Sequence, residues 1–242
     1  MQKKRDYKYI IFDADHTLLN YLADERCAYQ RLYEKLGVEI SEALLVQSRK
    51  HSEEAWTDAG LYDVSSEYIQ KNYHTLYRTH TEEIFNRLFI DFPFLREKGN
   101  AKDLGLAFLS ELIYAGNAID GALETVDALS KKHRVCVATN GLSKMQRARL
   151  APFSQKIDKL YISEEVGAIK PLPAFFGFIL RDLNARAEEC LMVGDSLHSD
   201  ILGGKRAGMD CCWFAPKKAE NDGEIRPDYQ INDLKELISI LQ

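Results

Sequence analysis

Two aspartates separated by one residue, Asp13 and Asp15, follow an apolar run in the segment YIIFDADHTLL, and Thr17 comes next in the same spacing. Carboxylates are rarely buried unless they are paired or bound to a cation, so acids at the end of a buried strand need a metal, a hydrogen-bond network or a catalytic role. A polar turn that follows a strand is the alternative for this segment taken alone. The segment supplies candidate catalytic and metal-binding carboxylates.

Three further polar clusters interrupt apolar runs later in the chain. They are Thr139-Asn140-Gly141 after VCVA, Lys170 before Pro171, and Asp195 with Asp200 after CLMVG. Each has an ordinary alternative when considered alone: a turn, an exposed lysine and a helix cap, respectively. Only their joint position in the fold can separate these alternatives from a functional site.

The elements that would position these clusters alternate between strand and helix. We expect strands at 7–12, 135–139, 159–162, 190–194 and 210–214, and helices at 121–132, 143–150, 172–184 and 198–207. This alternation predicts βαβ units, and hence an α/β fold with a doubly wound parallel sheet. All the clusters then fall at the carboxyl ends of strands, where open α/β sheets bind their ligands.

A long helical pattern separates the first strand from the rest of this α/β pattern. Apolar residues recur at three- and four-residue spacings from residue 24 to about 115, with a break at 92–99. We therefore expect a helical cap at 20–115, inserted into a core made of 1–19 and 116–242.

Composition limits the class of protein. The chain has 242 residues, 45% of them hydrophobic, and a net charge of −5 without a basic block, which argues against a nucleic-acid polymer as partner. The first apolar run stops at Asp13, too early for a signal peptide or a membrane span. The cysteines form no C-x-x-C pair and the histidines show no zinc-ligand spacing. We expect a cytoplasmic protein with reduced thiols and no membrane partner, as a monomer or homodimer.

The clusters together contain a carboxylate pair, further acids, a threonine, an asparagine and a lysine. Mg²⁺ prefers oxygen ligands, and proteins often bind it with one or two carboxylates and the phosphate of the substrate. This set of side chains is therefore suited to holding a phosphate monoester beside a divalent cation.

The same residues carry a family resemblance. The ordered set Asp13-x-Asp15-x-Thr17, Thr139-Asn140-Gly141, Lys170-Pro171 and Gly194-Asp195-x-x-x-x-Asp200 resembles the four motifs of the haloacid dehalogenase-like (HAD) hydrolase superfamily. The helical insertion resembles the C1 cap of that superfamily, because the segment between Thr139 and Lys170 is too short for the large C2 cap. The stretches VATNG, ISEEVGAIKP and LMVGDSLHSDILGGKRAGM are similar to the pyrimidine-type 5′-nucleotidase branch. His16 departs from the Asp or Gly that is common there.

The resemblance implies a Mg²⁺-dependent phosphoric monoester hydrolase, with Mn²⁺ as a possible substitute. Asp13 is the implied nucleophile, which forms an aspartyl-phosphate, and Asp15 is the implied general acid and base. The implied metal ligands are the Asp13 carboxylate, the Asp15 backbone carbonyl and Asp195. The implied phosphate-binding groups are Thr139, Asn140, Gly141 and Lys170, with Asp200 orienting Lys170 or a metal-bound water.

The expected substrate is a small phosphorylated metabolite, and the resemblance favours a pyrimidine nucleoside monophosphate. A sugar-phosphate phosphatase and a phosphomutase are the alternatives. A 2-haloacid dehalogenase has no leaving alkoxide to protonate, so Asp15 argues against it. A receiver-type phospho-acceptor lacks both the second acid and the cap, and a non-catalytic protein would not need every chemical position filled. The cap aromatics are better explained by packing than by stacking on a base.

Overall fold

The computed structural model describes residues 6–216 and 223–241 and divides into two compact units. The core unit comprises Met1–Asn20, Ala118–Ser143 and Leu150–Gln242, and the helical unit comprises Tyr21–Asn117 and Lys144–Arg149. The predicted domains, a cap at 20–115 within a core of 1–19 and 116–242, stay a prediction. The helical unit differs from the predicted cap in that it also contains Lys144–Arg149. Within the described residues, none of the helices combines the length and the apolar character needed to cross a membrane.

The core unit is built on a parallel sheet with the strand order β3-β2-β1-β4-β5-β6. Each neighbouring pair of strands runs in parallel. The strands are β1 (Tyr9–Phe12), β2 (Arg134–Thr139), β3 (Lys159–Ile162), β4 (Cys190–Gly194), β5 (Asp210–Phe214) and β6 (Tyr229–Ile231).

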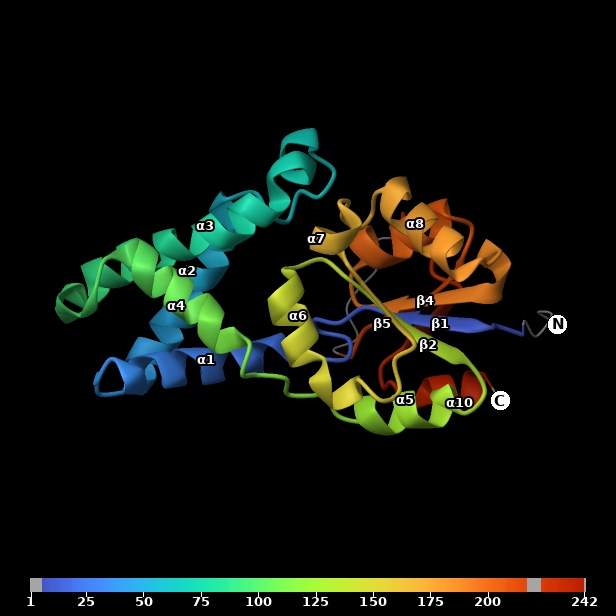
Figure 1. The fold of residues 1–242 in the computed structure, drawn as a ribbon, viewed down its shortest axis with the longest axis horizontal. Coiled ribbons are helices and arrows are strands. Elements are labelled where there is room, and N and C mark those ends of the chain that lie inside the picture. The colour runs from blue at the N-terminus through green and yellow to red at the C-terminus, as the bar shows by residue number, and fades with distance from the viewer. Residues whose placement is uncertain (1–5, 217–222, 242) are drawn as a thin grey trace. The chain divides into compact units, whose positions relative to one another are not determined.

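Both faces of this sheet are buried. In β1, Ile10 and Phe12 enter one hydrophobic cluster and Tyr9 and Ile11 enter the other, because successive strand residues point to opposite faces. The first cluster includes residues of α5 (Ala122–Ser130) and α10 (Glu236–Ile240), and the second includes residues of α8 (Pro173–Leu183). Figure 1 shows these helices on opposite sides of the sheet. The predicted doubly wound parallel sheet is confirmed.

Most predicted elements of the core unit lie within one or two residues of the observed ones. The predicted helix 198–207 instead begins as a π-helical turn, Leu197–Ile201, and continues as α9, Leu202–Arg206. No strand was expected after residue 214, where β6 adds to the edge of the sheet. The remaining short elements are α6 (Ser143–Arg149), α7 (Ser163–Val166) and the 3₁₀ turns Ala151–Phe153 and Ala187–Glu189.

The helical unit contains the helices of the predicted insertion. They are α1 (Tyr21–Lys35), α2 (Glu42–Asp58), α3 (Glu67–Asp91) and α4 (Ala101–Leu112), with a 3₁₀ turn at Pro93–Lys98 between the last two. Ser41 Oγ accepts a hydrogen bond from the N–H of Leu44, and Asn100 Oδ1 accepts one from the N–H of Asp103. These caps satisfy backbone donors that have no partner inside the helix.

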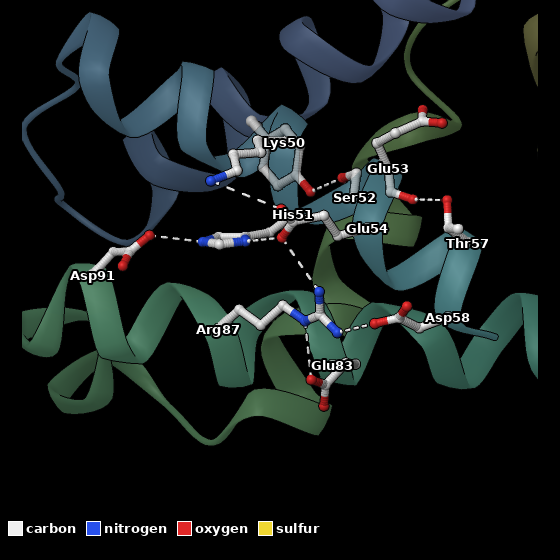
Figure 2. Close-up of polar contacts among 11 residues, drawn as sticks. Lys50, His51, Ser52, Glu53, Glu54, Thr57, Asp58, Glu83, Arg87 and Asp91 are labelled. Atoms are coloured by element: carbon white, nitrogen blue, oxygen red, sulfur yellow. Dashed lines mark hydrogen bonds and ion pairs between the residues drawn. The ribbon is translucent and has the colours of Figure 1, made fainter.

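Ion pairs join α2 to α3 within the helical unit. Figure 2 shows His51 between the carboxylates of Glu54 and Asp91. Its Nδ1 lies 2.9 Å from Glu54 Oε2, and its Nε2 lies 2.7 Å from Asp91 Oδ2. Arg87 of α3 contacts both Glu54, at 3.3 Å, and Asp58, at 2.5 Å. The two helices are therefore held by charged contacts as well as by apolar packing.

Candidate active site

The sheet reverses its winding direction between β1 and β4. The chain adds β2 and β3 on one side of β1 and then returns to place β4 on its other side. Such a switch point leaves a crevice at the carboxyl ends of the strands, where doubly wound proteins bind ligands. Asp13 directly follows β1 and Asp195 directly follows β4, so both carboxylates stand at the switch point.

Three carboxylates converge there. One oxygen from each of Asp13, Asp195 and Asp200 lies within 4.8 Å of the others. Asp13 and Asp200 are buried and Asp195 is half-buried. A cluster of oxygen donors of this kind suits a hard divalent cation such as Mg²⁺, and the cation would offset the repulsion between the acids. The residues present therefore fit the predicted metal, and the backbone carbonyl of Asp15 stays a predicted ligand.

Lys170 lies among these acids and is almost fully buried, with 2% of its surface exposed. Its Nζ donates to Asp13 Oδ1 at 2.5 Å, to Asp200 Oδ1 at 2.7 Å and to the backbone carbonyl of Ala138 at 2.9 Å. All three ammonium protons thus have acceptors, which a buried charge requires. The alternative reading of Lys170 as an exposed surface charge is wrong.

The protonation equilibria of this cluster are strongly perturbed. Burial raises the pKa of Asp13 well above its ordinary value, and the Lys170 charge opposes this shift. Burial and the neighbouring Asp200 charge raise the pKa of Asp195 to about 7. Burial alone would lower the pKa of Lys170, but Asp13 and Asp200 outweigh it and raise that pKa. Titratable groups shifted by burial and by specific partners, close together at a ligand-binding edge, are typical of a functional site.

Groups around β4 fix the acids in position. Asp200 Oδ2 accepts the N–H of Ser196 at 3.1 Å, and a Cβ at Gly194 would clash with the Asp200 carboxylate. Only glycine therefore leaves room for that carboxylate. Thr17 Oγ1 donates to Asp195 Oδ1 at 3.5 Å, and the Trp213 indole N–H donates to the Asp195 carbonyl at 2.8 Å.

The cluster after β2 has a positioning role that sequence reasoning did not predict. The Asn140 side chain brackets the backbone of Lys170: its Nδ2 donates to the Lys170 carbonyl at 3.0 Å, and its Oδ1 accepts the Lys170 N–H at 2.8 Å. The N–H of Gly141 donates to Ser163 Oγ at 2.9 Å, so it must share or leave Ser163 to reach a phosphate oxygen. Thr139 is buried at the end of β2. The roles of these groups as phosphate ligands stay predictions.

The segment after Asp13 makes a tight turn. His16 is exposed and has a φ of 63°, in the left-handed region, and its N–H donates to the carbonyl of Leu19 at 2.8 Å. This backbone conformation favours glycine and, among other residues, asparagine, aspartate and histidine. Asp15 is half-buried, and its charge contributes to the raised pKa of Asp195, so the two carboxylates lie near each other.

Ser163 and Trp213 were missed as parts of this site. Ser163 opens α7 directly after β3, and Trp213 lies near the carboxyl end of β5, so both occupy the same edge of the sheet as the predicted clusters. Their position at strand ends was the available signal.

All five cysteines are free thiols, as expected.

The chain is similar to known hydrolases. A family model described as haloacid dehalogenase-like hydrolase matches residues 7–208. The pyrimidine 5′-nucleotidase PynA of Streptococcus pneumoniae is 31% identical over 97% of this chain and 95% of that protein. The pyrimidine 5′-nucleotidase YjjG of Escherichia coli is 29% identical over 97% and 98%. The crystal structure of the HAD-hydrolase YfnB from Bacillus subtilis, solved with magnesium bound, superposes with a TM-score of 0.81 at 26% identity, covering 98% of this chain and all of that one.

Proposed function

Since the chain belongs to the haloacid dehalogenase-like hydrolase family, we propose that it hydrolyses small phosphate monoesters through an aspartyl-phosphate on Asp13. The observation that carries this proposal is the cluster at the switch point, in which the buried Asp13, Asp200 and Lys170 lie together with the half-buried Asp195. It supplies a carboxylate nucleophile, a cation for the phosphate and acids for a metal, which is what phosphoryl transfer requires.

In the first step, a carboxylate oxygen of Asp13 attacks phosphorus. The new O–P bond forms as the bond from phosphorus to the ester oxygen breaks, and Asp15 donates a proton to the departing alkoxide. In the second step, Asp15 takes a proton from water, which attacks the aspartyl-phosphate and releases phosphate and free Asp13. Splitting the displacement in this way replaces one difficult reaction by two easier ones.

The remaining residues stabilise charge. Lys170 exchanges its contact with Asp13 for a phosphoryl oxygen and, together with the Thr139 hydroxyl, stabilises the negative charge that develops there. Asp200 binds the ammonium group of Lys170, and Asn140 binds its backbone. The ammonium group is therefore positioned before substrate arrives. Mg²⁺, or Mn²⁺ in its place, held by Asp13, the Asp15 carbonyl and Asp195, would reduce the repulsion between anionic phosphate and anionic nucleophile. The magnesium bound in the YfnB structure supports magnesium as the cation.

The substrate class that we propose is a pyrimidine nucleoside 5′-monophosphate. Relatives named pyrimidine 5′-nucleotidases in two bacteria, PynA and YjjG, match this chain along nearly its whole length. The similarity therefore extends over the helical unit as well as over the core unit.

A substrate panel tests the proposal. The purified protein is assayed for phosphate release from UMP, dUMP, dTMP, purine monophosphates and sugar phosphates, with Mg²⁺ and with excess chelator. We expect the highest kcat/KM for a pyrimidine monophosphate, and no release with chelator. Equal rates for nucleotides and sugar phosphates would remove the nucleotidase assignment. No release from any ester with Mg²⁺ present would overturn the phosphatase assignment. Undiminished release by Asp13→Asn would overturn the assignment of Asp13 as nucleophile.

A further inference from the structure

A fully buried ion pair lies in the helical unit and has no part in the proposed chemistry. Asp24 lies in the first turn of α1, and Arg149 is the last residue of α6; neither side chain is exposed. Arg149 Nε and Nη2 both donate to Asp24 Oδ2, at 2.9 and 2.7 Å. Arginine can make such a forked contact and lysine cannot, because the guanidinium is planar and has several fixed donors.

The other oxygen of Asp24 binds the chain where it leaves the helical unit. Oδ1 accepts the N–H groups of Gly116 and Asn117, at 3.0 and 2.8 Å, and the Asn117 side-chain amide at 2.8 Å. Arg149 Nη1 donates to Gln146 Oε1 at 2.9 Å. This dense set of hydrogen bonds offsets the cost of burying two charges, and it ties the entry of the helical unit, its exit and α6 to one another.

Other contacts also attach α6 to the helical unit. The Tyr77 hydroxyl of α3 points at Met145 Sδ, 4.0 Å away, and the Arg149 guanidinium stacks over the Tyr21 ring, 5.3 Å from its centre. Residues Lys144–Arg149 accordingly form one compact unit with Tyr21–Asn117.

The loop that leads into α6 is bonded to the core unit instead. Asn140 holds the backbone of Lys170, Gly141 donates to Ser163, and the N–H of Ser143 donates to Glu164 Oε2 at 2.7 Å. The loop and Ser143, the first residue of α6, thus have core contacts, and the chain continues from there into Lys144–Arg149, which belong to the helical unit.

We propose that Asp24 and Arg149 are a positioning pair for the phosphate-binding loop at 139–142. They act through α6: by fixing the end of this helix to the helical unit, they restrict the conformations of the loop that precedes it. This rests on the proposed function of that loop. The effect of the pair is on how the loop holds a phosphate.

The kinetic test compares two variants within the helical unit. Arg149→Lys keeps the charge but loses the fork, whereas Glu111→Gln breaks ion pairs with Arg31 and Lys35, between α4 and α1, and leaves α6 untouched. At a temperature at which both are folded, we expect Arg149→Lys to weaken inhibition by inorganic phosphate and to lower kcat, each about tenfold, as small displacements of positioning groups do. Glu111→Gln should stay within about twofold of wild type in both constants.

Hydrogen exchange provides a readout that needs no turnover. In Arg149→Lys, and more strongly in Asp24→Asn if it folds, the amides of 140–142 should exchange about tenfold faster than in wild type and in Glu111→Gln. Equal exchange in Arg149→Lys and Glu111→Gln would overturn the inference, as would equal changes in phosphate inhibition. If wild type neither releases nor binds phosphate, the proposed function fails, but the exchange measurement still decides whether the pair orders the loop.

Discussion

At the scale of single residues, Asp15 carries the most specific chemical assignment. It follows the nucleophile by two residues, and residues i and i+2 of an extended segment point the same way. We expect Asp15→Asn to fold and to lose about 10²–10⁴-fold in kcat on a nucleotide, the usual worth of general acid–base help. The loss should be smaller in the phosphorylation step with p-nitrophenyl phosphate, whose leaving group needs no proton.

Rapid-mixing measurement of the p-nitrophenol burst gives that first step directly. Asp13→Asn is the control, because it removes the nucleophile and should abolish the burst for every leaving group. If Asp15→Asn lowers the rate of the phosphorylation step equally with the nucleotide and with p-nitrophenyl phosphate, Asp15 is not the acid.

Glu25 gives a prediction about pH and stability. It is buried in α1 beside Arg49, 3.2 Å away, and burial raises its pKa to about 7. The folded state therefore holds the proton more tightly than the unfolded state. The stability that this provides is complete below the ordinary glutamate pKa and is lost as the pH rises through about 7.

We expect Glu25→Gln to remove this loss. Relative to wild type, its free energy of unfolding should increase between pH 4.5 and pH 8 by on the order of 2–3 kcal/mol, the value of the pKa shift. Urea titrations across this pH range measure it. Glu67→Gln, at an exposed position on α3, should follow the wild-type curve throughout. A constant difference between Glu25→Gln and wild type at all pH values would contradict the assignment.

The sequence indicated acids and a lysine that the structure places together, because such residues at strand ends are unusual. It did not predict which groups hold them. Asn140 bonding to Lys170, and Ser163 bonding to Gly141, depend on two loops meeting across the sheet edge. Such contacts are set by tertiary structure. Asn140 was expected to bind phosphate and not to hold Lys170, and Ser163 was not singled out at all.

At the scale of elements, the α2–α3 contacts make a prediction about the helical unit. Arg87 pairs with Glu54 and Asp58 of α2 and with Glu83 of its own helix, and its side chain is only 22% exposed. We expect Arg87→Met to lower the free energy of unfolding by about 1–2 kcal/mol, because several partly desolvated pairs are lost together. Denaturant titration measures this change.

Lys71 offers a matched control on the same helix. It also pairs with a glutamate one turn away, Glu67, but both side chains are largely exposed. Lys71→Met should change the unfolding free energy by less than about 0.5 kcal/mol. Similar effects of the two substitutions would mean that the network in Figure 2 adds nothing beyond single surface pairs.

The buried central strands were easier to predict than the edge strand β6 and the helical segment that follows β4. Central strands such as β4 are buried on both faces and appear as continuous apolar runs, whereas β6 is short and has polar residues beside Ile231. Asp200 lies in the π-helical turn Leu197–Ile201 and accepts a hydrogen bond from Lys170. The spacing of apolar residues predicts a helix here but does not indicate that its first turn is π-helical.

At the scale of the whole molecule, the groups assigned to phosphoryl transfer all belong to the core unit. Asp13, Asp15, Lys170 and Asp195 lie in its sequence ranges, and none of them comes from the helical unit. These groups recognise features that every phosphate monoester shares. Discrimination between leaving groups therefore needs other side chains, and the helical unit is the large segment that the core chemistry leaves unused.

We therefore expect the helical unit to determine which monophosphate is preferred. A chimera carrying the corresponding segments of a sugar-phosphate phosphatase of this family should change the order of kcat/KM among monophosphates and keep its dependence on Mg²⁺. The exchanged segments must include 144–149 as well as 21–117, because the Asp24–Arg149 contact joins them. A second chimera that exchanges 21–117 alone breaks this contact and should lose kcat on every substrate. Asp13→Asn in the first chimera controls for contaminating phosphatases. If the first chimera is active and retains the original order of substrates, leaving-group selection resides in the core unit.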